Sequence, residues 1–296
     1  MYKRQVLAST QHRNVISARS HTDFLFSLRE ALTEAARRGH EELLEAWTPP
    51  GKLRAQNLIM GAVLSAFGLA PFHDLFLTRP HPGLGGDRPW EDAVLRALSC
   101  GPVGIGDAPG MTDAQLVDKL LVAGRLAQPD APPRPHLPSL KEDVHLYWTE
   151  RRAQDLSWYY LLALNTAEEE RPFKLSLPFD PGEHCAWDGY TGRPVDTLAG
   201  VLPPGGMAYF VLAPEVGGIS PLGYRGKLVP APHRGFAAER DGKGIRIWSN
   251  GTPVLVRGKA LSAQGGNGSP VELGRENGLW TVAPRRGQGW IRIVRR

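Results

Sequence analysis

The sequence has few of the features that hold small secreted or membrane proteins together. Cys100 and Cys185 are the only two cysteines among 296 residues, and they lie far apart in the sequence. They imply neither a disulfide framework nor a zinc site. No apolar run approaches the roughly 18–20 residues that a membrane span needs, and the first residues lack the apolar core of a signal peptide. We therefore expect a reduced, cytoplasmic protein with no membrane partner.

The chain also has no basic stripe. Its net charge is +5, but the arginines are dispersed and cluster only in pairs such as Arg37-Arg38 and Arg285-Arg286. Nucleic-acid binding calls for basic residues gathered on one face and interleaved with aromatic ones. We expect a solvated surface, no nucleic-acid partner, and an Arg, Ala, Gly and Pro richness that reflects a GC-rich, bacterial genome.

The content of hydrophobic residues is 42% and that of charged residues 22%, which predicts a globular chain of one large or two smaller domains. The first half alternates helix and short strand, as parallel α/β folds do. Apolar periodicity predicts helices over 24–44, 58–67 and 90–98, and Thr112-x-x-Gln115 reads as a capping box that opens a helix to about Leu126. The predicted strands are 75–78 and 101–107.

A proline-rich stretch, "QPDAPPRPHLPSL" over 128–140, has five prolines and reads as a linker. Beyond it, residues 141–296 alternate strand and turn patterns, which predicts an antiparallel β-sandwich or two small sheets, with a break near 226–235. Asn250-Gly251 and Asn277-Gly278 each indicate a tight hairpin. The predicted strands include "VHLYW", "LSWYYLLALN", "HCAWD", "MAYFVLA", "GIRIW", "PVLVR", "LWTVA" and "WIRIV".

Polar residues follow or flank three of the predicted strands of the first half. Arg19 and Asp23 point to the same side of "VISARSHTD", while His73 and Asp74 lie in "FHDLFL" and Asp107 follows "GPVGIG". A parallel barrel keeps its reactive groups at the carboxyl ends of its strands. Two plainer interpretations stay open, namely a surface ion pair for Arg19 and Asp23 and a turn-forming role for Asp107. We expect no metal, because no set of His and Asp residues has a recognised ligand spacing.

Taken in order, these motifs resemble a known family. "ARSHTDF", "PFHDLFLTRPHP", "CGPVGIGDAPG" and "LVDKLLVAGRLAQPDAPPRP" are similar to the second part of raffinose synthases and alkaline α-galactosidases, in glycoside hydrolase family 36. The resemblance spans about 15–230 and includes "CAWDGYTGRPV" and "LPPGGMAYFVLAP" of the β-region. It implies the last three strands, six to eight, of a (β/α)8 TIM-type barrel over 6–127, followed by the β-domain.

The resemblance also implies an activity. It makes the chain part of a retaining α-galactosidase or α-galactosyl transferase acting on an oligosaccharide with a terminal α-galactose, of the raffinose or melibiose type. Asp23 corresponds to the general acid/base, and Arg19, His73, Asp74 and Asp107 are the expected substrate-binding residues. No cofactor is expected. Where the family pattern has Gly-Gly, Ser and Trp, this chain has Cys100-Gly101, Gly106 and His73, which favours a bacterial-type α-galactosidase relative over a raffinose synthase.

The same resemblance predicts that the chain is a fragment. The strand with the Asp nucleophile comes earlier in such barrels, so we expect this chain alone to be inactive, and a longer parent remains compatible with a signal peptide of its own. "MYKRQ", residues 1–5, matches the translation of a sequencing adaptor read from a GTG start, which suggests a metagenomic reading frame.

Two other classes of protein remain open. A non-catalytic sugar-binding or structural β-module carrying a remnant barrel would bind sugar through residues 141–296. A complete small α/β protein without sugar chemistry would close residues 6–126 into a full layer.

Overall fold

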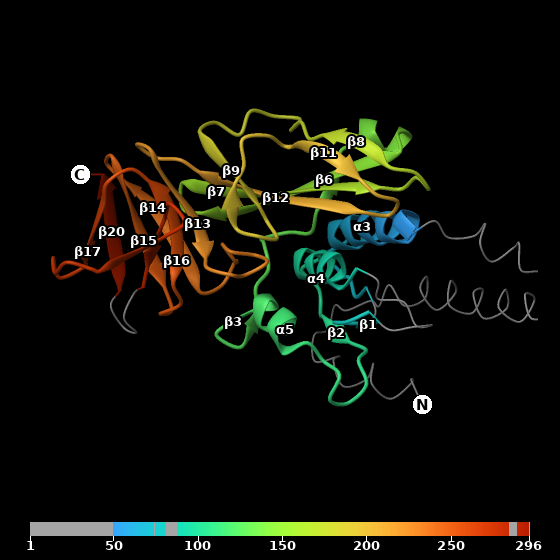
Figure 1. Ribbon diagram of the computed structural model, residues 1–296, viewed down its shortest axis with the longest axis horizontal. Helices are drawn as coiled ribbons and strands as arrows, with labels where there is room; N and C mark the ends of the chain where they lie inside the picture. Colours follow the sequence, from blue (N-terminus) through green and yellow to red (C-terminus); the bar gives the residue numbers. More distant parts are fainter. Residues whose placement is uncertain (1–49, 74, 81–87, 284–288, 296) are drawn as a thin grey trace, which may run out of the picture.

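The computed structural model describes residues 50–73, 75–80, 88–283 and 289–295. The part described is mostly sheet, with few helices. Figure 1 shows the helices α3 (Pro50–Ala66) and α4 (Pro89–Leu98) beneath a long central sheet, with two further sheets at the end of the molecule away from α3. The predicted helix over 24–44 lies outside the described residues.

A strand–helix–strand unit follows helix α3 in the described part of the chain. Strand β1 (Leu75–Phe76) pairs parallel with β2 (Gly104–Ile105), and α4 (Pro89–Leu98) connects them. This confirms the predicted order of strand, helix and strand in this stretch. Proline in the first turn and Glu91 and Asp92 beside it suit the start of α4, since carboxylates are favourable at the positive end of a helix dipole.

The two neighbouring helices differ from their predicted limits. Helix α3 (Pro50–Ala66) starts eight residues before the predicted Leu58. Helix α5 (Ala114–Leu120) is capped by Asp113, whose side chain accepts hydrogen bonds from the amides of Gln115 and Leu116, so the predicted Thr112 capping box is wrong.

Among the described residues, no helix is long and apolar enough to cross a membrane.

Helix α5 ends at Leu120 instead of Leu126 because a small hairpin follows. Its strands are β3 (Leu121–Val122) and β4 (Arg125–Leu126). Ala123 and Gly124 form the turn with positive φ angles of 50° and 74°, a conformation that no helix can continue through.

A six-stranded sheet forms the centre of the β-region, in the order β10-β9-β12-β7-β6-β5. The proline-rich segment supplies its edge strand β5 and the 3-10 helix η3, and an edge suits proline because it cannot donate to a second neighbour. The strand bounds are β5 Arg134–Pro135, β6 Val144–Ala153, β7 Leu156–Asn165, β9 His184–Asp188, β10 Arg193–Pro194 and β12 Met207–Pro214, and η3 is Leu137–Lys141.

The central sheet is buried on both faces. Along β7, Trp158, Tyr160 and Leu162 join the large core that includes α3 and α4, whereas Leu161 and Ala163 join a second core. The short pair β8 (Arg171–Lys174) and β11 (Ala199–Leu202) covers that second face. Two-sided burial explains why "LSWYYLLALN" is apolar at nearly every position instead of alternating.

The last part of the chain folds into two four-stranded antiparallel sheets that share the large core. Their orders are β13-β16-β19-β18 and β14-β15-β20-β17. The bounds are β13 Ile219–Tyr224, β14 Phe236–Asp241, β15 Gly244–Ser249, β16 Val254–Gly258, β17 Leu261–Gly265, β18 Leu273–Glu276, β19 Leu279–Val282 and β20 Trp290–Arg295.

One predicted hairpin is present and the other is not. Asn277 and Gly278, with φ of 52° and 80°, join β18 to β19 in a two-residue turn, as predicted. Asn250-Gly251 instead lies between strands of different sheets, because β15 pairs with β14 and β20 while β16 pairs with β13 and β19. Its Asn side chain accepts from Thr252 N and Oγ1, so the chain turns without pairing.

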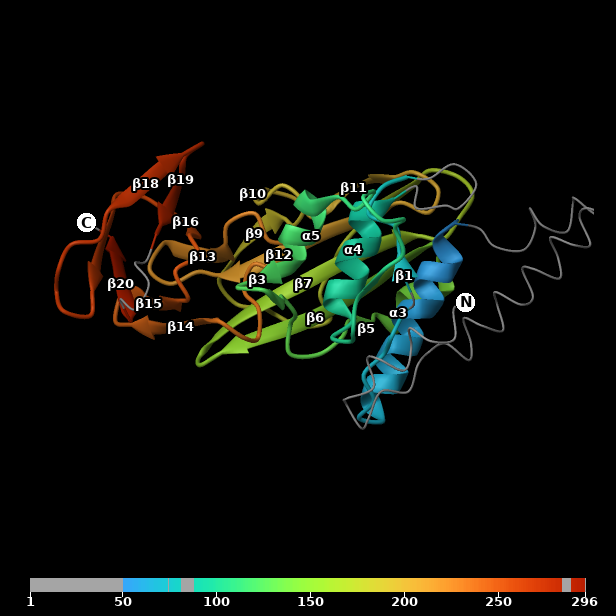
Figure 2. The ribbon, with the colours of Figure 1, turned by 90° about the horizontal axis from the view of Figure 1, so that it is seen from below.

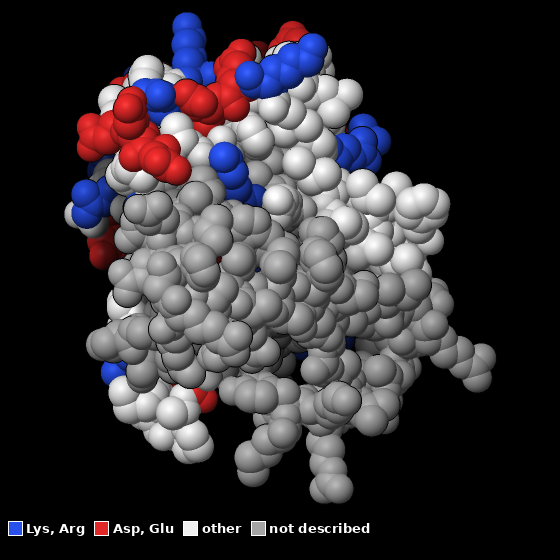
Figure 3. Space-filling model, turned by 90° about the vertical axis from the view of Figure 1, so that its right-hand side faces the viewer, with Lys and Arg blue, Asp and Glu red and all other residues white. Residues whose placement is uncertain are grey.

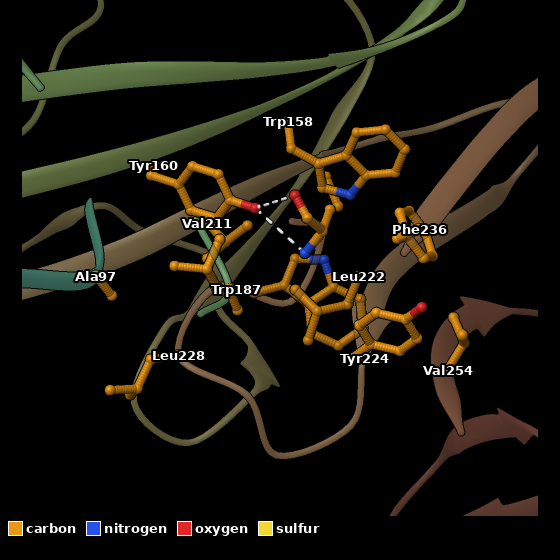
Figure 4. Packing of buried hydrophobic residues seen from close by; sticks show 14 of the residues in the cluster. Ala97, Trp158, Tyr160, Trp187, Val211, Leu222, Tyr224, Leu228, Phe236 and Val254 are labelled. Carbon is orange, nitrogen blue, oxygen red and sulfur yellow. Dashed lines mark hydrogen bonds between the residues drawn. The ribbon is translucent and has the colours of Figure 1, made fainter. Parts of the chain in front are cut away.

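Aromatic residues of the central sheet anchor the later sheets. Tyr160 Oη donates to the carbonyl of Ala231 at 2.9 Å, and Trp158 Nε1 donates to that of Pro221 at 2.9 Å. Figure 4 shows these side chains packed with Trp187 and Tyr224, and Figure 2 shows α3 and α4 lying across the central sheet. The strand–helix–strand unit and all three large sheets therefore share one continuous core.

On the face shown in Figure 3, acidic and basic side chains lie beside one another.

Gly101 provides a test of how closely the chain packs before β1 and β2. A Cβ at this position would lie 1.6 Å from the carbonyl oxygen of Pro71, so backbone would have to move. We expect Gly101→Ala to lower the free energy of unfolding by about 2–3 kcal/mol or more, as measured by urea titration. Gly266→Ala is the matched control, since its Cβ would meet nothing nearer than 3.7 Å. Equal effects of the two substitutions would contradict the packing described.

Candidate functional site

The structure describes two of the five predicted site residues. Arg19, Asp23 and Asp74 lie outside the described residues, so their roles stay predictions. His73 and Asp107 are described, and they occupy different surroundings. Asp107 follows the carboxyl end of β2, whereas His73 precedes β1 instead of ending it.

Asp107 is held by the chain that follows β1. Its Oδ1 accepts from the amide of Thr78 at 2.9 Å, and its Oδ2 accepts from the hydroxyl of Thr78 at 2.5 Å. The same hydroxyl oxygen accepts from the amide of Asp113 at 2.7 Å. Thr78 thus joins the two strand ends to the start of α5.

This arrangement fixes the orientation of one carboxylate at a strand end. Each carboxylate oxygen has a second lone pair, so Asp107 retains acceptor capacity after both bonds to Thr78. The residue is only partly buried and adjoins Ala108, Pro109 and Gly110, which are exposed. A ligand with hydroxyl groups can therefore approach a carboxylate whose position is already set.

The ring of His73 faces helix α3 instead of the strand end. A Cβ on Gly61 would lie 3.2 Å from both Cε1 and Nε2 of the ring, and only 7% of the residue is exposed. Its Nδ1 has no hydrogen-bond partner in the described part of the chain. Burial, and to a smaller extent the charge of Arg96, lower the pKa of this imidazole from 6.5 to about 4. The predicted contact of His73 with substrate stays a prediction.

A buried group of charges, which the sequence patterns did not indicate, joins α3 and α4 to the central sheet. Arg54 Nε lies 3.0 Å from Asp92 Oδ1, and its Nη1 donates to the carbonyl of Gly205. Arg88 pairs with Glu91 at 3.1 Å and donates to the carbonyl of Pro204. Burial raises the pKa of Glu91, and the charges of Arg88 and Arg54 oppose this rise.

A cleft of about 530 Å³ lies elsewhere, between the β9–β10 turn, the loop after β13 and the β18–β19 hairpin. Sequence reasoning missed it, because its walls come from segments that lie far apart in the chain. Its polar lining includes Asp188, Arg193, Arg225 and Glu276. Among the residues that the structure describes, no cluster of His, Cys, Asp and Glu is arranged to hold a metal ion.

Comparisons with known proteins give structural similarity only. No family model matches the chain, and no curated protein matches its sequence. The fold is similar to α-galactosidase I from Mortierella vinacea, with a TM-score of 0.39, 13% identity, and coverage of 52% of this chain and 43% of that one. It is also similar to a putative α-galactosidase/melibiase from Bacteroides fragilis, with a TM-score of 0.37, 17% identity, and coverage of 54% and 38%.

The chain thus spans less than half the length of each of these two structures. At identities of 13% and 17% and TM-scores below 0.5, this similarity indicates neither an activity nor a substrate. What the chain does must therefore be argued from its own residues.

Thr78→Val tests the junction at the strand end. The substitution keeps the shape of this fully buried side chain but leaves the Asp113 amide and Asp107 Oδ2 without their hydroxyl partner. We expect the free energy of unfolding to fall by about 1–3 kcal/mol, measured by urea titration. Thr78→Ser keeps the hydroxyl, so its free energy of unfolding should fall by less. A serine variant as unstable as the valine variant would contradict the role of the hydroxyl.

His73 predicts a dependence of stability on pH. Because the pKa of His73 is lowered in the folded chain, this residue binds a proton below about pH 6.5 in the unfolded chain but stays neutral until about pH 4 in the folded chain. Stability is therefore fully present above pH 6.5 and falls toward pH 4, by a total on the order of 3 kcal/mol. His73→Gln should flatten the pH profile of the free energy of unfolding over this range. Parallel profiles for the two proteins would show that His73 is not the cause.

Proposed function

We propose that this chain is part of a glycoside hydrolase that acts on α-galactosides with retention of configuration. The substrate class is an oligosaccharide with a terminal α-galactose, of the raffinose or melibiose type. A related α-galactosyl transferase would use the same residues and differ in the acceptor.

The observation that carries the proposal is the unit β1–α4–β2, whose parallel strands are each followed two residues later by a polar residue, Thr78 and Asp107, that bond to each other. Parallel strands ending in fixed polar groups are the arrangement from which α/β barrels build sugar sites. Two of the resembling motifs, "PFHDLFLTRPHP" and "CGPVGIGDAPG", fall on this unit in the order that the family pattern requires, and a β-region follows them in the chain.

Cys100 gives independent support. Its φ is 60°, a left-handed conformation that favours glycine, and the family pattern has glycine at this position. The preceding helix and the following strand of this chain therefore meet through the backbone geometry that a Gly-Gly pair would suit. We also propose that this unit belongs to a (β/α)8 barrel.

Each proposed role follows from the chemistry of retention. A retaining glycosidase needs two carboxyl groups about 5–5.5 Å apart, one as nucleophile and one as acid/base. Asp23 is the proposed acid/base, and the nucleophile would come from a strand outside this sequence, so the chain alone would not turn over substrate. Arg19 and Asp74 would bind sugar hydroxyls, together with Asp107 in its fixed orientation.

The test is Asp23→Asn in the longer parent protein. Asparagine keeps the size of the side chain but removes the transferable proton, and general acid catalysis contributes about 10²–10⁴-fold. Cleavage of raffinose and melibiose should fall by this factor, while the first step on a dinitrophenyl α-galactoside, whose leaving group needs no proton, should change far less. Azide should then speed turnover and give an α-configured galactosyl azide, since azide needs no general base.

Arg19→Lys is the matched control, because a sugar-positioning contact weakens all substrates together whatever their leaving group. Equal slowing of both substrate classes by Asp23→Asn, without azide rescue, would remove Asp23 from the acid/base role. No turnover of any α-galactoside by the unchanged parent would overturn the hydrolase proposal and favour a non-catalytic β-module.

A further inference from the structure

We propose that the cleft between the β9–β10 turn and the β18–β19 hairpin binds a neutral mono- or disaccharide. Its volume of about 530 Å³ falls within the range of pockets that hold small ligands. The inference rests on the chemistry of this cleft alone. It depends neither on Asp107 nor on the proposed hydrolase activity.

Two opposite charges face the cleft without pairing. Asp188 on β9 and Arg193 on β10 are direct cross-strand partners, so their side chains lie on one face of the sheet. Both line the cleft, yet no ion pair joins them in the described part of the chain. Asp188 Oδ2 and the Arg193 guanidinium have no hydrogen-bond partner there either. A carboxylate and a guanidinium held side by side can accept from and donate to neighbouring hydroxyls of one sugar ring.

The other charges in the lining have partners of their own. Arg225 pairs with Glu276 at 2.6 Å, and Lys227 pairs with Asp118 at 2.8 Å. The Lys119 ammonium lies over the ring of Trp90. Among the described lining residues, the Asp188 carboxylate and the Arg193 guanidinium thus lie side by side without an ion pair, an arrangement that suits the neighbouring hydroxyls of an uncharged ligand.

The rest of the lining suits the carbon skeleton of a sugar. Leu255 is partly exposed and contributes apolar surface, against which the C–H face of a pyranose can pack, whereas Leu222 and Val211 are buried in the wall. The Thr191 hydroxyl and the Asn277 amide have no hydrogen-bond partners among the described side chains and offer further polar groups. A small zwitterion such as glycine would use only the two charges, whereas a sugar would also use the apolar surface and these further polar groups.

The β9–β10 turn is held in place before any ligand binds. Asp188 Oδ1 accepts from the amides of Tyr190 at 2.9 Å and Thr191 at 2.7 Å, which leaves Oδ2 directed by the turn itself. Gly189 packs so closely on Tyr209 that a Cβ would lie 2.3 Å from its ring. Fixed polar groups lose little freedom on binding, which favours recognition of a small, weakly interacting ligand.

The test measures binding to the full chain by saturation-transfer NMR and calorimetry. The probes are galactose, glucose, mannose and melibiose, with inorganic phosphate and glycine as charged comparisons. We expect saturable binding of at least one neutral sugar. Arg193→Ala and Asp188→Asn should each weaken it by about tenfold or more, because each removes a hydrogen bond to a charged group. Asn at 188 keeps the Oδ1 acceptor that the turn requires.

Arg234→Ala is the matched control, since Arg234 is exposed and does not line the cleft. It should leave the affinity unchanged, and all variants should unfold at the temperature of the unchanged chain. Three results would each overturn the inference. They are absence of saturable sugar binding, a sugar affinity in Arg193→Ala and Asp188→Asn equal to that of the unchanged chain, and preferred binding of phosphate or glycine. Sugar binding lost in these variants, with no α-galactoside turnover by the parent, would support the cleft and contradict the hydrolase.

Discussion

The fold depends on a buried ion pair between two helices. Arg54 of α3 and Asp92 of α4 have side chains only 11% and 15% exposed, and their atoms meet at 3.0 Å. Asp92 also lies 3.7 Å from Arg96, so the three side chains form one buried charge cluster, and breaking a buried ion pair is strongly destabilising. Since Arg54 also donates to the carbonyl of Gly205, just before β12, the pair ties both helices to the start of a strand of the central sheet.

Both candidate sites follow from this one placement. Helix α4 connects β1 to β2, so its position on the sheet determines where the strand ends at Thr78 and Asp107 lie. At the other end of the same sheet, β12 pairs with β9, whose last residue is Asp188 in the cleft. The strand ends and the cleft thus rest on one hydrophobic core.

Local patterns in the sequence predicted local structure well. The α4 helix, the long strand β7 and the Asn277-Gly278 turn follow from periodicity and turn chemistry that a few neighbouring residues determine. Asn250-Gly251 failed because the same dipeptide suits any tight turn, and only distant pairing decides which sheet the next strand joins. Asp113 took the capping role expected of Thr112, since Thr78, remote in sequence, binds its amide. The cleft and the Arg54–Asp92 pair are likewise products of tertiary packing that no local pattern contains.

The central claim is that the strand–helix–strand unit and the central sheet form one cooperative body. Native-state hydrogen exchange tests it most directly, by comparing the amides of Leu95, Ala97 and Leu98 in α4 with those of Tyr160 and Leu162 in β7. One body predicts that both groups exchange only through the same global opening, with equal opening free energies and equal dependence on denaturant. If the α4 amides exchange through a separate opening of lower free energy while β7 stays protected, the ion pair does not join the two parts and the account is wrong.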